Sequence, residues 1–134
     1  MEQDIRAFDA SLAVDPITGL PGRDALIHLA RRALDRQTGM DGLTAVMIVE
    51  FGSVRHVYQN AGYRDGDRVL REAGQRIAGC LPPTGRVGWT LHQFVILLWD
   101  LDTVQTARAI AKSVVAALAE PFGPPGHRFY LYSN

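Results

Sequence analysis

The sequence is poor in cysteine, carries no excess charge of either sign and contains no long apolar run. Cys80 is the only cysteine among 134 residues, so the chain can form neither an internal disulfide nor a zinc cluster of cysteines. The 14 Lys and Arg residues balance the 14 Asp and Glu residues, which argues against nucleic-acid and anionic-membrane partners. The longest apolar runs, residues 44–51 and 94–99, are too short to span a bilayer. We therefore expect a soluble, cytoplasmic domain.

The length of the chain limits the number of domains, and its loop residues indicate where the first elements begin and end. A chain of 134 residues, 47% of them hydrophobic, fits one domain with a substantial core. Arginine outnumbers lysine 13 to one, which would suit phosphate binding, although the neutral net charge favours a bias in composition. Residues 1–14 have apolar side chains near helical spacing and no basic start, so they predict an amphipathic linker helix rather than a signal peptide. A loop rich in Pro and Gly follows at 15–22.

The spacing of apolar residues predicts alternating helices and strands. Helical spacing marks residues 24–37, 54–62 and 65–81, and a further helix that Thr103 caps and Pro121 ends. Apolar runs predict strands at residues 44–51, 86–90, 94–99 and 128–132, with a hairpin connection at 91–93. This order predicts an α/β (α+β) fold, with one sheet flanked by helices.

Three short motifs resemble those of one family, in the same order and with the same spacing. Asp15-Pro-Ile-Thr-Gly-Leu-Pro-Gly-Arg23 resembles the opening loop D-x-L-T-G-L-P-N-R of GGDEF domains, the diguanylate cyclase family. The stretch 62–70, G-Y-R-D-G-D-R-V-L, is similar to the family's G-H-x-x-G-D-x-x-L, and 120–122 is similar to its P-F motif. In the opening loop we expect a structural role for five residues: Asp15, Gly19, Leu20, Pro21 and Arg23.

The resemblance implies a palm-like fold with a central, mainly antiparallel sheet. Active members of the family condense two GTP molecules into cyclic di-GMP. The resemblance implies that carboxylates at two strand ends would hold Mg²⁺ for this reaction. It also implies a hairpin with two glycines, since a Cβ there would stand in the way of the nucleotide. Residues 15–134 of this chain would form such a domain, and the sequence would stop before the domain's last strand and helix.

The signature hairpin departs from the family pattern at four of its positions. Aligned on the strand that begins at Phe94, Thr90 and Leu91 stand at the two glycines, His92 at the metal-binding acid and Gln93 at the Glu. His92 would be a metal ligand only together with His56 or Glu50, and a polar histidine at a hairpin tip is the simpler interpretation.

The remaining site positions are mostly changed as well. Glu50 keeps the first carboxylate of the family's D-x-D, while Gly52 replaces the second. Tyr58 replaces the Asn that helps to bind guanine, and its partner acid is kept as Asp67. Tyr58 and Tyr63 stand at positions that face the nucleotide in the family, so they either fill the pocket that the nucleotide would occupy or lie elsewhere. The family's inhibitory R-x-x-D motif is missing at residues 81–84.

These departures lead to a functional hypothesis. We expect no catalytic residues, no metal site and no cofactor, with at most weak binding of GTP and Mg²⁺ through vestigial Glu50, Tyr58 and Asp67. The hypothesis is a non-catalytic regulatory or interaction module of bacterial cyclic di-GMP signalling. Its expected partners are an EAL phosphodiesterase or sensory domain in a longer chain, a second copy, or a regulatory protein. The alternatives are a GTP-binding sensor without turnover and an active diguanylate cyclase.

Overall fold

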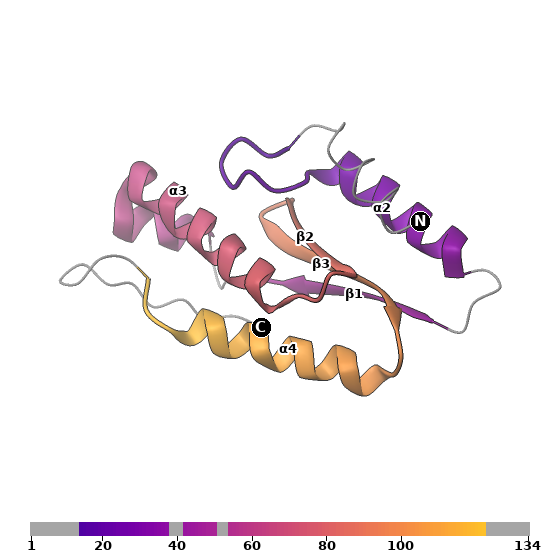
Figure 1. Cartoon of the computed structure of the whole chain (residues 1–134). Helices are drawn as coiled ribbons and strands as arrows, with labels where there is room; N and C mark the ends of the chain where they lie inside the picture. Colours follow the sequence, from indigo (N-terminus) through magenta and orange to yellow (C-terminus); the bar gives the residue numbers. More distant parts are fainter. Residues whose placement is uncertain (1–13, 38–41, 51–53, 123–134) are drawn as a thin grey trace.

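The computed structural model describes residues 14–37, 42–50 and 54–122. In these ranges a three-stranded antiparallel sheet lies between helices (Figure 1). The strands occur in the spatial order β1-β3-β2, with bounds β1 Leu43–Val49, β2 Gly85–Thr90 and β3 Gln93–Leu101. The helices are α2 Arg23–Gln37, α3 Val54–Cys80 and α4 Val104–Ala119. This architecture confirms the predicted α+β fold with a mainly antiparallel sheet flanked by helices.

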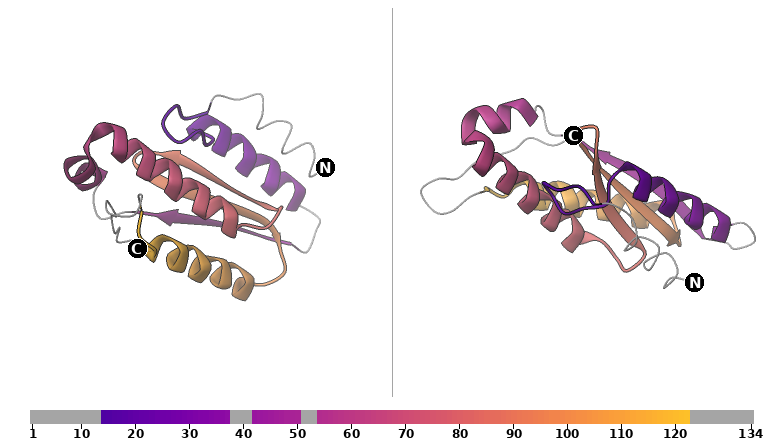
Figure 2. Two further views of the ribbon diagram at one scale, coloured as in Figure 1. Left: turned by 60° about the vertical axis from the view of Figure 1, so that its left-hand side comes forward. Right: turned by 90° about the horizontal axis from the view of Figure 1, so that it is seen from above.

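The two faces of the sheet are buried by different helices, because successive side chains of a strand point to opposite faces. Phe94, Ile96 and Leu98 of β3 are fully buried in the main core, which α3 and α4 complete. Leu97 and Trp99 of β3 point the other way and pack against α2 in a second, smaller cluster. Figures 1 and 2 show α2 on one side of the sheet and α3 with α4 on the other. Among the described helices, none is both long and apolar enough to cross a membrane.

Helix α3 joins the two helices that the sequence predicts at 54–62 and 65–81. The backbone at Gly62 is not helical, with φ 80° and ψ 168°, and the helix kinks there. Positive φ is accessible to glycine because it has no Cβ. In Figure 2 the first turns of α3 accordingly run in a different direction from the rest. The predicted break at Gly62 is therefore confirmed, although the second helix resumes directly after it.

The hairpin is tighter than the sequence predicts. Thr90 pairs with Gln93, so Gln93 belongs to β3 and the connection is only Leu91 and His92. The prediction of a connection over residues 91–93 was thus one residue too long, because the backbone of Gln93 continues the ladder. The predicted Thr103 cap is confirmed, since its hydroxyl accepts from the amide of Thr106 at 3.3 Å. The predicted linker helix 1–14 and strand 128–132 lie outside the described residues, apart from Val14.

One arginine ties α3 to the end of α4. Arg76 donates to three backbone carbonyls at this end, those of Ala117 at 3.0 Å, Glu120 at 2.8 Å and Pro121 at 2.7 Å. It also donates to the Glu72 carboxylate at 2.9 Å, and its guanidinium lies 3.8 Å from the centroid of the Phe122 ring. The last carbonyls of a helix have no partner within the helix. Arg76 supplies partners for them from another element.

Candidate functional site

The opening loop is held by the side chain of Asp15. Its Oδ2 accepts from the amide of Ile17 at 3.1 Å, the amide of Thr18 at 2.8 Å and the hydroxyl of Thr18 at 2.9 Å. The Thr18 hydroxyl in turn accepts from the amide of Leu20 at 3.2 Å. Because this carboxylate oxygen accepts three hydrogen bonds inside the loop, it serves the loop's own conformation.

Backbone contacts attach the same loop to the sheet and to α3. The amide of Asp15 donates to the carbonyl of Leu20 at 2.7 Å, and the amide of Gly19, at φ 73°, donates back to the carbonyl of Asp15 at 2.8 Å. The carbonyl of Pro21 accepts from Trp89 of β2 at 3.0 Å. Arg71 Nε donates to the carbonyl of Ile17 at 3.2 Å. Arg23 begins α2 and lines an apolar groove between that helix and the sheet.

The tip of the β2–β3 hairpin consists of two residues with left-handed backbone. Leu91 has φ 53° and His92 has φ 61°, and the Leu91 side chain is 79% exposed. The His92 ring meets the Trp89 ring edge-on, with the centroids 6.4 Å apart. Trp89 itself packs against Phe94 at 4.6 Å, and both tryptophans of the chain are buried. Trp89 and Trp99 therefore pack against the sheet, in its two core clusters.

The left-handed backbone at Leu91 and His92 should lower the stability of the protein, and substitutions that suit this backbone should restore it. Left-handed backbone costs about 1–2 kcal/mol per residue for side chains with a Cβ, and Asn-Gly is the preferred pair in two-residue turns with positive φ. We therefore expect Leu91→Asn with His92→Gly to raise the free energy of unfolding by about 1–2 kcal/mol in urea titrations. The control is Leu91→Ser, which removes the exposed apolar group but keeps a Cβ in the strained position. Equal stabilisation by both variants would contradict a role for strain.

At the other end of the candidate site, Glu50 follows β1 and lies beside the start of β3. The Gln93 side-chain amide donates a hydrogen bond to Glu50 Oε1. Among the described residues no group of three or more His, Cys, Asp or Glu side chains is arranged to hold a metal ion. Gly52 and the side chain of His56 lie outside the described residues, so the alternative of a His56–His92 metal pair has no structural test.

Tyr58 and Asp67 lie on the two sides of the kink in α3 and contact each other. The Tyr58 hydroxyl donates to Asp67 Oδ1 at 2.5 Å. The Tyr58 ring lies against the backbone of Gly66, where a Cβ would come within 2.6 Å of Cδ1 of Tyr58. The kink at Gly62 thus folds the first part of the helix back toward the second. The side chain of Tyr63 lies outside the described residues.

The residues predicted from the sequence fall into two pairs and a loop, and they do not form one cluster. The pairs are Glu50 with Gln93 and Tyr58 with Asp67. Both pairings were missed at the level of sequence, although each joins residues that the motif comparison singles out separately. Arg76 was missed altogether, and its only local signal is Glu72 one helical turn earlier.

Comparisons with known proteins place the chain among signalling domains. Residues 12–132 match the family model described as diguanylate cyclase, GGDEF domain. The chain is similar to the signaling protein YkoW of Bacillus subtilis, 26% identical over 117 residues that make up 84% of this chain and 14% of YkoW. It is also similar to the diguanylate cyclase DgcP of Pseudomonas aeruginosa, 25% identical over 89% of this chain and 19% of DgcP. The chain thus spans a fifth or less of these two relatives.

The fold has counterparts among solved structures. The isolated GGDEF domain of TpbB, or YfiN, from Pseudomonas aeruginosa has a TM-score of 0.83 at 24% identity. The match covers 90% of this chain and 72% of that structure. At this identity the likeness concerns the fold, and it agrees with the sheet and helices described above.

Proposed function

The chain belongs to the GGDEF domain family of diguanylate cyclases, and we propose that it is a non-catalytic regulatory or interaction module of bacterial cyclic di-GMP signalling. One observation carries the proposal. Glu50 and Asp67, the two acidic residues kept at the family's metal and guanine positions, each accept a hydrogen bond from a side chain of this chain. The donors, Gln93 and Tyr58, both stand where the family has another residue. The acids therefore serve internal contacts.

The donor set does not fit the metal ions that the cyclase reaction requires. Mg²⁺ prefers hard oxygen ligands in octahedral geometry, usually carboxylates together with phosphate oxygens and water. Of the family's acidic positions around the metal, Gly52, His92 and Gln93 carry no carboxylate. Glu50 alone would have to hold the ions, and one of its two oxygens already accepts from Gln93.

The guanine position is also changed in a way that disfavours a GTP sensor. An acid that accepts from the base must face the base, whereas Oδ1 of Asp67 faces the Tyr58 hydroxyl and accepts from it. The Tyr58 ring also occupies the space over Gly66. A nucleotide at this position would have to displace the Tyr58 ring, and a displaced Tyr58 hydroxyl would lose its acceptor, which costs about 1–3 kcal/mol if the hydroxyl stays buried.

A regulatory module acts through neighbours, and the comparisons support such a setting. YkoW and DgcP are several times longer than the matched region, so in those proteins the domain is one part among others. We propose an EAL or sensory domain in the same chain as the neighbour, and a second copy or a regulatory protein as a further partner. The opening loop, which contacts both α3 and β2, is suited to transmit movement from the preceding segment into the domain.

The test is an assay for product under conditions in which an active cyclase succeeds. Purified protein is incubated with GTP and Mg²⁺, and cyclic di-GMP is measured by liquid chromatography with mass spectrometry. We expect no product above the blank, while an active diguanylate cyclase gives a clear signal. The matched control is Glu50→Gln, which removes the remaining carboxylate but keeps its shape. Product from the natural protein that disappears in Glu50→Gln would overturn the proposal.

The nucleotide-sensor alternative has its own readout. Titration calorimetry with GTP and Mg²⁺ at millimolar concentration should give no heat of binding. Binding that is strengthened in Tyr58→Phe, which removes only the hydroxyl that contacts Asp67, would favour the sensor over the interaction module. Absence of binding in both proteins supports the module.

A further inference from the structure

Helix α3 consists of two parts that meet at one residue. Gly62 has φ 80° and ψ 168°, and the turns before it, residues 54–61, run in a different direction from the turns after it (Figure 2). Side chains with a Cβ rarely adopt positive φ, whereas glycine adopts it freely. A Cβ at Gly62 would meet no atom within 4 Å, so the position needs glycine for its backbone conformation and not for lack of space. Residues of this kind absorb the backbone change when a segment moves about a hinge.

Tyr58 spans this bend and joins the first part of α3 to the second. Its hydroxyl donates to Oδ1 of Asp67 at 2.5 Å, and its ring lies against the backbone of Gly66. The ring fits there because Gly66 has no side chain, since a Cβ would come within 2.6 Å of Cδ1 and 2.9 Å of Cε1 of the tyrosine. The ring also packs against the main core. One side chain of the first part thus makes both a polar and an apolar contact across the bend.

We propose that residues 54–61 form a flap that turns about Gly62 and is held closed by Tyr58. The inference rests on the proposed function, in which Asp67 serves an internal contact. In the closed state the Tyr58 ring occupies the surface that Asp67 and Gly66 form. In the open state this surface presents a carboxylate beside backbone without a side chain. It then suits a flat ring with a hydrogen-bond donor at its edge, because that is the chemistry that Tyr58 presents to it.

The helical structure of the flap depends on its contact with the rest of the domain. Residues 54–61 make about two helical turns, and isolated helices shorter than about 12–15 residues are marginal in water. A hydrogen bond to a charged group, such as that from Tyr58 to Asp67, changes the ratio of closed to open molecules by about 10-fold to 100-fold. Losing the contact therefore opens the flap more often, and the exchange of its amide hydrogens measures how often.

Hydrogen exchange of the amides of residues 58–61, measured by NMR in the full chain, tests the proposal. These are the flap amides past the first four, which have no acceptor within a helix. Gly66→Ala displaces the ring without changing Tyr58, so we expect at least about tenfold faster exchange at residues 58–61, while residues 69–77 keep their rates. Unchanged exchange in Gly66→Ala, or full exchange of these amides in the natural protein at the rate of an unfolded chain, would overturn the proposal.

Matched variants separate the contact of Tyr58 from a general effect on the helix. Gly79→Ala is the control for Gly66→Ala, because it replaces a glycine of the same helix at a position where the new Cβ meets no atom within 4 Å. It should leave the exchange of the flap unchanged. Tyr58→Phe removes only the hydroxyl and should speed exchange about tenfold, whereas Gln59→Ala, at the exposed neighbour, should have no effect. Equal rates in Tyr58→Phe and Gln59→Ala would contradict a flap held by this hydrogen bond.

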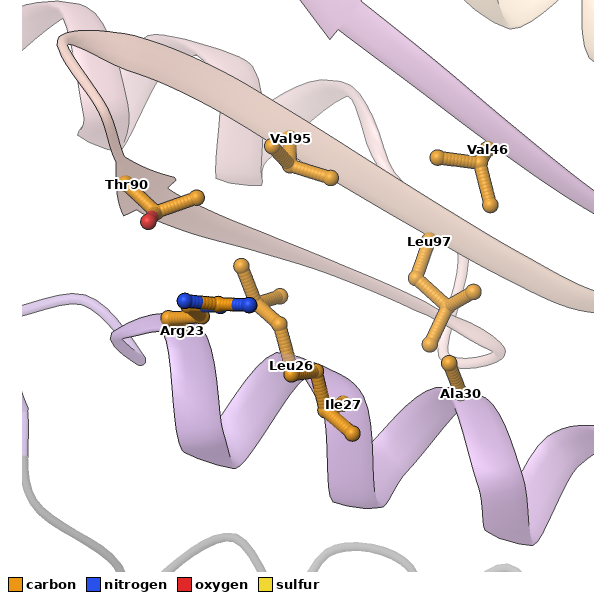
Figure 3. Close-up of a pocket in the computed structure, with 8 residues that line it drawn as sticks. All are labelled: Arg23, Leu26, Ile27, Ala30, Val46, Thr90, Val95 and Leu97. Carbon is orange, nitrogen blue, oxygen red and sulfur yellow. The ribbon is translucent and has the colours of Figure 1, made fainter.

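Side chains on the other side of the sheet report whether the whole domain changes. Ile27, Val46 and Leu97 line a groove between α2 and the sheet (Figure 3), away from α3. Their methyl signals should keep their chemical shifts in every variant, and a general shift would mean that the flap does not open as a separate unit. The assay for cyclic di-GMP is independent of this test. Product from GTP would overturn the proposed function, whereas unchanged exchange in Gly66→Ala would overturn the flap alone.

Discussion

Replacing Arg76 by methionine is expected to lower the free energy of unfolding by about 2–3 kcal/mol, because three backbone carbonyls lose a charged donor and a hydrogen bond to a charged group is worth about 1.5–3 kcal/mol. Arg76 donates to the carbonyls of Ala117, Glu120 and Pro121 and is only 20% exposed. Its stacking on Phe122 adds about 0.5–1 kcal/mol or more. Methionine keeps the unbranched stem, so the loss reports the guanidinium rather than a cavity. Urea titration followed by circular dichroism gives the value.

Two controls make the Arg76 prediction specific. Arg68→Met should change the stability by less than about 0.5 kcal/mol, because its pair with Asp65 is long, at 3.9 Å, and largely exposed. Arg76→Lys should lie between the natural protein and Arg76→Met, since lysine keeps the charge but not the planar array of donors. If Arg76→Met were no more destabilising than Arg68→Met, the contact between α3 and α4 would not depend on these hydrogen bonds.

The sequence predicts those features of the fold that depend on local spacing. The apolar stripe of α2 and the alternating burial of β3 follow from periods of 3.6 and 2 residues. The break at Gly62 follows from the freedom of glycine, and the Thr103 cap from its hydroxyl. For each of these, the residues that decide the structure are neighbours in the chain.

The sequence does not predict contacts that depend on how the elements meet. Arg76 contacts residues 41 to 45 positions away, and nothing near it in the chain indicates that α4 ends beside it. Similarly, the hydrogen bond from Gln93 to Glu50 requires β1 and β3 to be neighbours in a given register. The motif comparison identifies both residues as site positions but gives no reason for them to contact each other.

The same distinction applies to the candidate site. The residue types at Gln93 and Gly52 are enough to predict that catalysis is lost, because neither side chain carries a charge. Whether the remaining acids are free is a question of geometry. Tyr58 and Asp67 are nine residues apart on either side of a kink, so their hydrogen bond exists only because α3 bends at Gly62. An unbroken helix would rotate these two side chains to different faces.

Replacing Asp15 by alanine is the second change with a large expected effect. We expect the free energy of unfolding to fall by about 2–3 kcal/mol, because a donor that loses its acceptor costs about 1–3 kcal/mol. One carboxylate oxygen accepts from two amides and from the hydroxyl of Thr18, a side chain that is only 7% exposed. The loop also carries the Pro21 carbonyl that bonds to β2. Disorder in the loop would therefore reach the sheet. Chemical denaturation measures the loss.

Two control variants test whether the effect of replacing Asp15 comes from its hydrogen bonds or from its charge. Asp15→Asn keeps an acceptor oxygen at the same place and loses only the charge, so it should cost less than Asp15→Ala, about 1 kcal/mol, the typical worth of a neutral hydrogen bond. Asp35→Ala removes an exposed carboxylate from the last turns of α2, where the helix dipole disfavours negative charge, so it should not destabilise the protein. Equal losses for Asp15→Ala and Asp35→Ala would mean that net charge matters, and not the hydrogen bonds of the loop. A loss confined to Asp15→Ala, smaller in Asp15→Asn, identifies the carboxylate oxygen as the group that holds the loop against α3 and β2.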